Sequence, residues 1–368
     1  HLENLYALYK ALETSRRERG AIDFDTTETR IVFDDNGKID DIVPVMRNDA
    51  HRIIEECMLA ANVAAARFFE RRKMPSIYRI HDLPQLEKLE DLRAFLGQLG
   101  LSLGGGDKPT AIDYSKLLVE VKGRPDAELI QTVLLRSMSQ AVYSTENIGH
   151  FGLAYSAYTH FTSPIRRYPD LLVHRALKHL VNGGKPHDFE YGVADLQTMA
   201  EHCSATSRRA DEATRDAMDT LKAEYMHDKV GEEYSGIITS VTSFGLFVML
   251  DDIYVDGLVH ITALDRDYFH FDPIGHRLTG DRSGITYRLG DPLKIRVAAV
   301  NIEDRKIDFV LAESSGKQDS SGQAPSKSRK SRSRSRSRSG KDDARTGRKT
   351  SDKSGARGKS KSRSKRRT

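Results

Sequence analysis

Apolar residues recur at three- and four-residue spacing through much of the first 228 positions, which is the period of a helix that buries one face. In residues 48–73, Ile54 and Met58 follow this spacing, Asn48 is a favourable N-cap and Pro75 follows the end. This stretch is therefore predicted to be one helix with both ends marked. The same spacing predicts helices at residues 1–12, 126–141, 170–181 and 191–227, and we expect a break in the last.

Two other regions have the pattern of strands. Residues 30–33 and 38–43 flank Asp34-Asp35-Asn36-Gly37, whose residue types favour a tight turn, so a β-hairpin is predicted. Short runs rich in Val, Ile and Phe follow at residues 233–241, 245–250, 255–260, 293–301 and 306–311. Five strands within so short a segment are typical of an OB-type barrel.

The last region, residues 313–368, has almost no apolar side chains and repeats Ser-Arg from position 331 to 339. Such a segment cannot bury enough surface to offset the entropy of ordering, so we expect it to be disordered. The predicted fold is α+β and multidomain. It comprises a mainly helical part at residues 1–228, a five-stranded OB-type barrel at residues 229–312, and a basic tail.

Charge is unevenly divided along the chain. The net charge is +5, but residues 314–368 hold 20 Lys and Arg against 4 Asp, and the remainder holds 38 basic against 49 acidic residues. The tail thus carries the positive charge. The net charge of the remainder does not by itself indicate a nucleic-acid-binding surface.

The composition also bears on the compartment. No apolar run is long enough to span a membrane and no signal peptide precedes the first predicted helix, so we expect a cytoplasmic protein without a membrane partner. Cys57 and Cys203 have neither metal-ligand nor disulfide spacing, which fits a reducing compartment. Because the sequence starts at His1 inside a predicted helix, we expect it to be a portion of a longer protein.

The densest group of chemically useful residues is HFGLAYSAYTHFTSPIRRYPDLLVHRAL, residues 150–177. Its adjacent arginines suit a phosphodiester, because a guanidinium stays charged and donates two parallel hydrogen bonds to phosphate oxygens. Pro164 fixes the backbone before Arg166 and Arg167, which favours a rigid turn at a helix start. From spacing by itself, a structural ion pair from either arginine to Asp170 is the favoured reading.

This stretch resembles the motif that ends the catalytic domain of the ribonuclease II/R family. The segments RNDAHRIIEECMLAANVAAARF, residues 47–68, and RRADEATRD, residues 208–216, are also similar to this family, and the resemblance extends over residues 1–312. The long basic tail favours the hydrolytic R type. The resemblance implies a 3′→5′ exoribonuclease that degrades single-stranded and structured RNA processively to nucleoside 5′-monophosphates, with Mg²⁺ as its cofactor.

The resemblance also assigns individual residues. Arg166 is expected at the scissile phosphate, with Arg167 as the second choice. Glu55 is expected at the 3′-terminal nucleotide, with the adjacent Glu56 as the alternative, and Phe24 on a base near the RNA 3′ end. Residues expected to support the motif or to line the RNA channel are Ser163, Tyr168, Asp170, His174, Arg209 and Glu212. The last two have a second reading as an ion pair within one helix.

The segment GEEYSGIITSVTSFGLFVMLDDIYVDGLVHITAL resembles the opening of an S1 domain. This resemblance implies that Phe244, Phe247 and His260 stack on RNA bases, and stacking is worth about 1–3 kcal/mol per base. Without it, Phe247 would be read as a barrel core residue. Residues that could contact phosphates are Arg296, Arg305 and Lys306. On a hairpin, the last two are otherwise ordinary solvated charges.

One feature of the family has no counterpart in the sequence. The family holds its magnesium with closely spaced aspartates, and the Asp pairs present here, such as Asp34-Asp35, are better explained by turn chemistry. We therefore expect the metal ligands to lie mostly outside this chain, and this chain by itself to be inactive. The competing prediction is a non-catalytic S1-type RNA-binding protein of the translation machinery. The tail has two readings, either a docking segment for the ribosome or trans-translation factors, or a solubilising segment.

Overall fold

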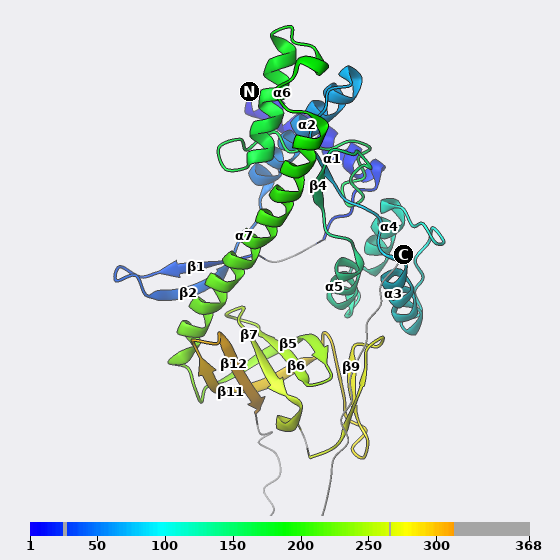
Figure 1. Cartoon of the computed structure of the whole chain (residues 1–368). Coiled ribbons are helices and arrows are strands. Elements are labelled where there is room, and N and C mark those ends of the chain that lie inside the picture. The colour runs from blue at the N-terminus through cyan, green and yellow to red at the C-terminus, as the bar shows by residue number, and fades with distance from the viewer. Residues whose placement is uncertain (25–27, 265, 313–368) are drawn as a thin grey trace, which may run out of the picture. The chain divides into compact units, whose positions relative to one another are not determined.

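The structure is a computed structural model that describes residues 1–24, 28–264 and 266–312 (Figure 1). The described residues belong to one folded unit, His1–Ser314. Helices and strands are mixed within it, which confirms the predicted α+β class. The tail, for which disorder was predicted, lies outside the described residues.

The helices and strands before the barrel follow in chain order. α1 spans Leu2–Arg19, the hairpin strands β1 and β2 span Thr29–Phe33 and Ile39–Pro44, and α2 spans Asp49–Arg72. The short strand β3, Tyr78–Ile80, pairs antiparallel with β4, Val142–Ser144. Between these strands lie α3, Leu86–Gln98, α4, Ala111–Val121, and α5, Ala127–Ser137. α6 spans Tyr168–Val181, a 3-10 turn spans Pro186–Asp188, and α7 spans Val193–His227.

Helix α2 has the ends that its sequence predicts. The Asn48 side chain accepts hydrogen bonds from the backbone N–H groups of Ala50 and His51, and Lys73 ends the helix in the left-handed conformation. The buried face of α2 includes Val63 and Phe69. The local spacing and the cap were therefore sufficient to predict this helix.

Two predicted helices differ from the structure. α7 is one continuous helix, so the expected break is wrong. The stretch contains neither Gly nor Pro, and nothing else in it interrupts the backbone hydrogen bonds. The helix predicted to run to residue 141 ends at Ser137, because the following residues enter β4 and pair with β3. α3, α4 and the β3–β4 pair were not predicted.

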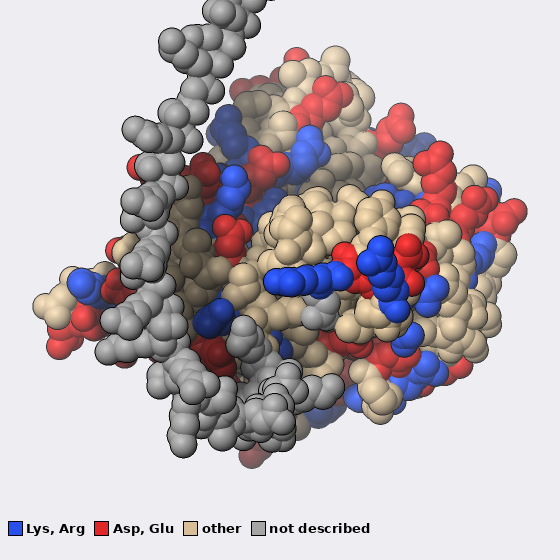
Figure 2. All heavy atoms as spheres, turned by 90° about the horizontal axis from the view of Figure 1, so that it is seen from below, with Lys and Arg blue, Asp and Glu red and all other residues tan. Residues whose placement is uncertain are grey.

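Charges of both signs are mixed on the surface that Figure 2 shows. Lys and Arg side chains lie among Asp and Glu side chains on this face, without one large area of a single sign. In residues 1–313 as a whole, 49 acidic residues outnumber 38 basic ones. Contacts to an anionic ligand must therefore come from locally placed cations.

The five predicted barrel strands are present, and their assignment is confirmed. β5, β6, β7, β11 and β12 span Glu233–Thr242, Gly245–Leu250, Asp256–His260, Pro292–Asn301 and Lys306–Leu311. They close a barrel in the order β11-β12-β7-β6-β5, in which β12 and β7 are parallel. A separate three-stranded sheet, which was not predicted, is inserted between β7 and β11. It consists of β8, Phe269–Asp272, β9, Arg277–Gly280, and β10, Thr286–Arg288.

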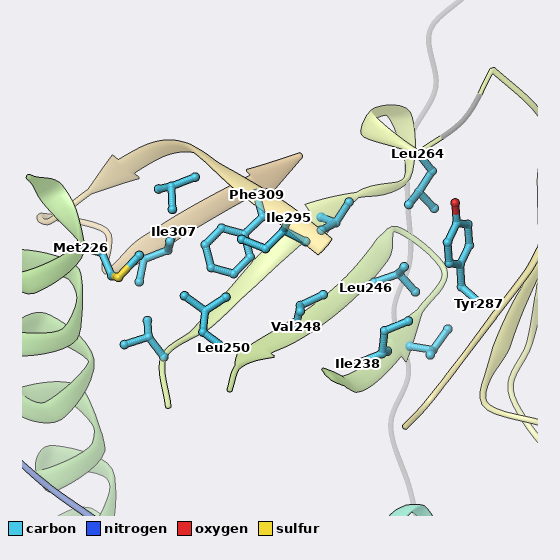
Figure 3. Packing of buried hydrophobic residues seen from close by; sticks show 14 of the residues in the cluster. Met226, Ile238, Leu246, Val248, Leu250, Leu264, Tyr287, Ile295, Ile307 and Phe309 are labelled. Carbon is cyan, nitrogen blue, oxygen red and sulfur yellow. The ribbon is translucent and has the colours of Figure 1, made fainter. Parts of the chain in front are cut away.

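The barrel core is closed at one end by α7. Phe309, Ile295 and Val248 are at most 1% exposed and pack together inside the barrel (Figure 3). Met226, in the last turn of α7, packs against the same cluster. The C-terminal part of this long helix is therefore fixed to the barrel by apolar burial.

Gly245 permits the tight turn between β5 and β6. Its φ is 155°, and a Cβ at this position would lie 2.3 Å from the carbonyl oxygen of Val259 on β7. Another residue would have to push the strands apart. This close approach sets the position of Phe244, the residue before the glycine.

Candidate nucleic-acid interface

The arginine-containing segment lies between α2 and α6, and both helices hold it. The Asn62 side chain of α2 donates to the Tyr158 hydroxyl at 3.0 Å and accepts from the backbone N–H of Phe161 at 2.9 Å. His174 of α6 stacks on Phe161 at 4.3 Å between ring centroids, and its Nε2 lies 2.8 Å from the Phe161 carbonyl oxygen. Helix packing thus fixes the segment, and His174 contributes to its support.

The two arginines have different environments. Asp170 in the first turn of α6 is fully buried, and its Oδ1 accepts from the Ser163 backbone N–H at 2.7 Å and from Arg167 at 2.8 Å. The structural ion pair therefore involves Arg167. Arg166 is exposed, and its side chain has no hydrogen bond or ion pair within the described ranges. The geometry leaves Arg166 available to a ligand, at the end of a turn that Asp170 holds.

A cavity of about 550 Å³ lies beside this turn. The residues that line it come mainly from α2 and its cap: Asn48, Ala50, His51, Ile54, Glu55, Met58, Leu59 and Asn62, with Tyr158 and Arg167 opposite. Its volume lies within the range of sites that hold a small ligand. The cavity joins one predicted acidic residue, Glu55, to Arg167, whereas Arg166 is not among the residues that line it.

The geometry distinguishes the two adjacent glutamates. Glu55 lines the cavity, is partly exposed and is paired with Arg47. Glu56 is 6% exposed and is turned toward α1, where Arg16 Nη1 lies 2.9 Å from its carboxylate. Arg16 also pairs with Asp23 at 3.2 Å. Glu56 is therefore held inside the protein, and Glu55 is the glutamate that faces the cavity.

Several other predicted residues lie apart from this cavity. Phe24 is partly buried against the apolar cluster of α3, α4 and α5, and is not among the residues that line the cavity. Arg209 and Glu212 are exposed on α7 and do not form the ion pair that was the second reading. Tyr168 is 45% exposed, with the Arg175 guanidinium 6.0 Å from its ring centroid.

Behind the turn that carries Arg166 and Arg167, which we call the arginine turn, imidazole and phenol rings pack together. The ring centroids of His150 and His160 lie 5.3 and 5.7 Å from that of Tyr158, and the Tyr143 hydroxyl is joined to His160 Nδ1 by a 2.8 Å hydrogen bond. Burial lowers the pKa of His150 and of His160 to about 3, and the charges of Arg167 and Arg79 act in the same direction on His160. Both imidazoles are therefore neutral at physiological pH.

A second cavity, of about 360 Å³, lies between the barrel and α7. Phe244 and Phe247 line it with their rings 6.1 Å apart and nearly perpendicular, together with Arg305 and Lys306. α7 contributes Asp219 and Lys222, which the sequence analysis did not single out. Aromatic rings beside cations are the combination that binds single-stranded nucleic acid.

The second reading of Phe247, as a core residue, does not fit its position. Its neighbours Leu246 and Val248 are fully buried in the barrel, whereas Phe247 is partly exposed on the opposite face of β6. This is the alternation expected of a strand with one face toward a core. Phe244 is 47% exposed.

The remaining barrel residues are less closely grouped. His260 is exposed, its Nδ1 bonds to the Thr262 hydroxyl, and it is not among the residues that line the second cavity. Arg296 is exposed on β11, also outside the lining. Arg305 pairs with Asp216 of α7 at 3.3 Å. Lys306 pairs with Asp304 at 3.5 Å.

Within the described ranges, no group of three or more His, Cys, Asp or Glu side chains is placed to hold a metal ion. No helix there is both long and apolar enough to cross a membrane.

Comparisons with known proteins bear on both parts of the chain. Residues 1–183 match the family model described as the RNB domain, and residues 227–311 match the S1 RNA binding domain. The chain is 52% identical over 336 residues to a protein named ribonuclease R from Vibrio cholerae. That match covers 89% of this chain and 41% of the relative. The chain therefore spans well under half the length of this relative.

Solved structures of Mycoplasma genitalium RNase R have the same fold. One, in complex with ribose methylated single-stranded RNA, has a TM-score of 0.78 at 30% identity and covers 84% of this chain and 49% of that chain. Another, in complex with double-stranded RNA, has a TM-score of 0.70 at 27% identity and covers 84% of this chain and 50% of that chain. The similarity includes the helical part as well as the barrel.

Proposed function

Because the chain belongs to the ribonuclease R family, we propose that it contributes the RNA-binding channel and the phosphate-binding arginine of a 3′→5′ exoribonuclease. The observation that carries this proposal is Arg166, an exposed and unpaired guanidinium on a turn that buried Asp170 holds rigid. Negative charge grows on phosphate oxygens during hydrolysis of a phosphodiester. A cation held in place beforehand stabilises that charge without reorganising.

In this proposal, the cavity beside Arg167 receives the 3′-terminal nucleotide. Glu55 lines the cavity beside its ion-pair partner Arg47, and its carboxylate accepts a hydrogen bond from a ribose hydroxyl. Glu56 takes no direct part, because its carboxylate is occupied by Arg16. Release of nucleoside 5′-monophosphates and processive action belong to the same proposal.

Mg²⁺ is the metal that the family implies, and the described residues do not fit it. Asp23 pairs with Arg16, Glu55 is the one carboxylate among the residues that line the first cavity, and no group of three possible ligands occurs within the described ranges. We therefore assign no step to a metal held by these residues. The proposal is that Mg²⁺ is required and is bound by residues outside this chain, so that the chain by itself does not hydrolyse RNA.

The barrel supplies a second contact with the same strand. Phe244 and Phe247 offer ring faces for bases, and Arg305 and Lys306 lie at the same cavity with charge for the backbone. Arg296 and His260 extend this surface on neighbouring strands. Base stacking and backbone contacts accept any sequence, which suits degradation of both single-stranded and structured RNA.

The basic tail is proposed to bind RNA or a partner such as the ribosome or trans-translation factors, in the cytoplasm. Its 20 Lys and Arg against 4 Asp support an electrostatic interaction that weakens steeply with salt. Deletion of residues 314–368 should lower the salt slope of RNA binding. An unchanged slope would leave the tail as a solubilising segment.

The experiment that tests the function uses a 3′-labelled single-stranded RNA with Mg²⁺. It compares this chain, a protein of the relatives' full length that contains this sequence, and that protein with Arg166→Ala or, as a control, Arg71→Ala on the exposed face of α2. We expect release of labelled nucleoside 5′-monophosphate by the long protein and its control, and a loss of order 10²-fold with Arg166→Ala. RNA binding without cleavage by the long protein would instead favour a non-catalytic S1-type RNA-binding protein.

A further inference from the structure

Arg79, in the middle of β3, is a second guanidinium without a protein partner. Its side chain is partly buried and makes no hydrogen bond or ion pair within residues 1–24, 28–264 and 266–312. The contact that holds it is the ring of Tyr143 on β4, whose centroid lies 4.6 Å from the guanidinium carbon. Stacking of this kind fixes the plane of an arginine but leaves its N–H donors free.

The backbone around Arg79 places it against the arginine turn. Its N–H donates to the Tyr158 carbonyl oxygen at 2.9 Å, which ties β3 to the segment that leads to Arg166. Tyr143, on which it stacks, is hydrogen-bonded to His160 at 2.8 Å. The ring of Tyr143 therefore links Arg79 to His160, an imidazole of the segment that leads to Arg166.

The charges of three arginines act on this imidazole, and buried Asp170 pairs with one of them, Arg167. Burial lowers the pKa of His160, and the charges of Arg167, Arg79 and Arg166 lower it further. Asp170 forms its ion pair with Arg167 and not with Arg79 or Arg166. The charges of Arg79 and Arg166 are therefore left without a direct partner among the described residues. The Nε of Arg167 is also buried without a hydrogen bond in the described part of the chain. A partly buried cluster of cations is unfavourable without an anion, so an anion bound here would stabilise it.

We propose that Arg79 binds a backbone phosphate of the RNA strand, a role that rests on the proposed function and adds a second guanidinium to Arg166. The ligand class is a phosphodiester oxyanion, for which the planar fork of arginine is suited. Tyr143 holds the guanidinium in orientation through its ring. Arg79 thus acts by touching the substrate, in contrast to Arg167, which Asp170 occupies.

Asp211 on α7 provides the competing explanation. Burial lowers the pKa of Arg79, and the charge of Asp211 acts in the opposite direction, although the two groups form no direct ion pair. If Arg79 served to interact with Asp211 across the space to α7, removing either charge would have the same effect. If Arg79 binds phosphate, removing the Asp211 charge should leave RNA binding equal or stronger.

The test uses the full 368-residue chain and a short single-stranded RNA, with affinity measured by fluorescence anisotropy between 50 and 300 mM salt. The variants are Arg79→Gln, Arg79→Lys, Asp211→Asn, Arg166→Ala and the exposed control Arg71→Gln. The tail is common to all, so its contribution cancels in the differences. Arg79→Gln is expected to weaken binding roughly tenfold and to reduce the salt slope by about 0.7, the value for one lost phosphate contact on a single strand. Arg71→Gln and Asp211→Asn should keep the unaltered slope.

A second measurement separates RNA phosphate from free phosphate. Inorganic phosphate is added and the thermal midpoint of each variant is followed. One outcome would overturn the proposal in favour of a free-anion site. In it, phosphate no longer raises the thermal midpoint of Arg79→Gln, but the salt slope of RNA binding by this variant equals that of the unaltered chain. An Asp211→Asn variant that behaves like Arg79→Gln would overturn it in favour of a structural interaction.

Two outcomes separate this proposal from the proposed function. If Arg166→Ala leaves RNA binding unchanged while Arg79→Gln lowers the slope, the role of Arg166 fails and the phosphate site at Arg79 stands. If Arg79→Gln does not fold, Arg79→Lys decides, because it keeps the charge and loses the fork. It should keep the slope and weaken binding about threefold, whereas an affinity equal to that of the unaltered chain would contradict the proposal.

Discussion

The buried histidines behind the arginine turn make stability depend on pH in a window where few other groups titrate. His150 and His160 have pKa values of about 3, against 6.5 for an unperturbed histidine. An unfolded histidine takes up a proton near pH 6.5, whereas the folded ones resist until about pH 3. Their contribution to stability is therefore complete above pH 6.5 and is lost progressively as the pH falls toward 3.

The size of the effect follows from the difference in pKa. At pH 5, the contribution of each histidine to the free energy of unfolding should be about 2 kcal/mol smaller than at neutral pH. For two independent histidines the decrease is about 4 kcal/mol. That is a large part of the 5–15 kcal/mol typical of a folded protein. The carboxylates with lowered pKa values, such as Asp267 and Asp272, lose their contribution only below about pH 4. The interval from pH 6.5 to 5 therefore reports on histidines, and burial also lowers the pKa of His81 and His276, so the share of His160 is measured with a variant.

The measurement is urea unfolding at several pH values between 7.5 and 5, followed by circular dichroism because the chain contains no Trp. His160→Gln removes one titrating group and keeps a polar atom near the Tyr143 hydroxyl. Between pH 7.5 and 5, the free energy of unfolding of this variant should fall by about 2 kcal/mol less than that of the unaltered chain. His187→Gln, at an exposed position, is the control and should follow the unaltered chain. If His160→Gln loses as much stability as the control, the buried neutral histidine is not the cause.

Three further changes test the packing around the site. Arg16→Gln leaves Glu56 buried without its partner and should cost about 3 kcal/mol of unfolding free energy, most of which Glu56→Gln in the same chain should restore; urea titrations of the single and double variants check this. Asp170→Ala removes the buried partner of Arg167 and should cost about 3 kcal/mol, seen as a lower thermal midpoint; an unchanged midpoint would show that the ion pair is unimportant to the turn. Phe309→Ala empties the centre of the barrel and should cost about 3–5 kcal/mol, with a loss of barrel structure detectable by hydrogen exchange.

Features encoded by short stretches of sequence were predicted correctly. The spacing and the Asn48 cap of α2, the Asp-Asn-Gly turn of the hairpin and the alternation in β6 each depend on a few neighbouring residues. The barrel assignment and the exposed face of Phe247 follow from the same alternation. Local period, capping and turn chemistry are sufficient in these places because tertiary packing agrees with them.

The prediction failed where the outcome depended on a distant partner. The helix predicted to run to residue 141 ends at Ser137, and β4, which follows at residue 142, pairs with β3, more than sixty positions earlier. The three-stranded insertion β8–β10 is built from short strands whose hydrophobic spacing gives little signal. The break expected in α7 had no physical cause, since the helix has neither Gly nor Pro.

The sequence by itself determined the two-part architecture, the arginine motif and the residue types available for RNA. The tertiary structure decided which of them face a ligand. Arg16 on α1 lies 2.9 Å from buried Glu56 and 3.9 Å from Glu55, which lines the cavity, and Asp170 pairs with Arg167 and leaves Arg166 exposed. Adjacent residues in one sequence are chemically equivalent until packing places partners beside one of them. Ion-pair partners forty positions apart, like the stacking of Arg79 on Tyr143, follow from the fold because no local pattern encodes them.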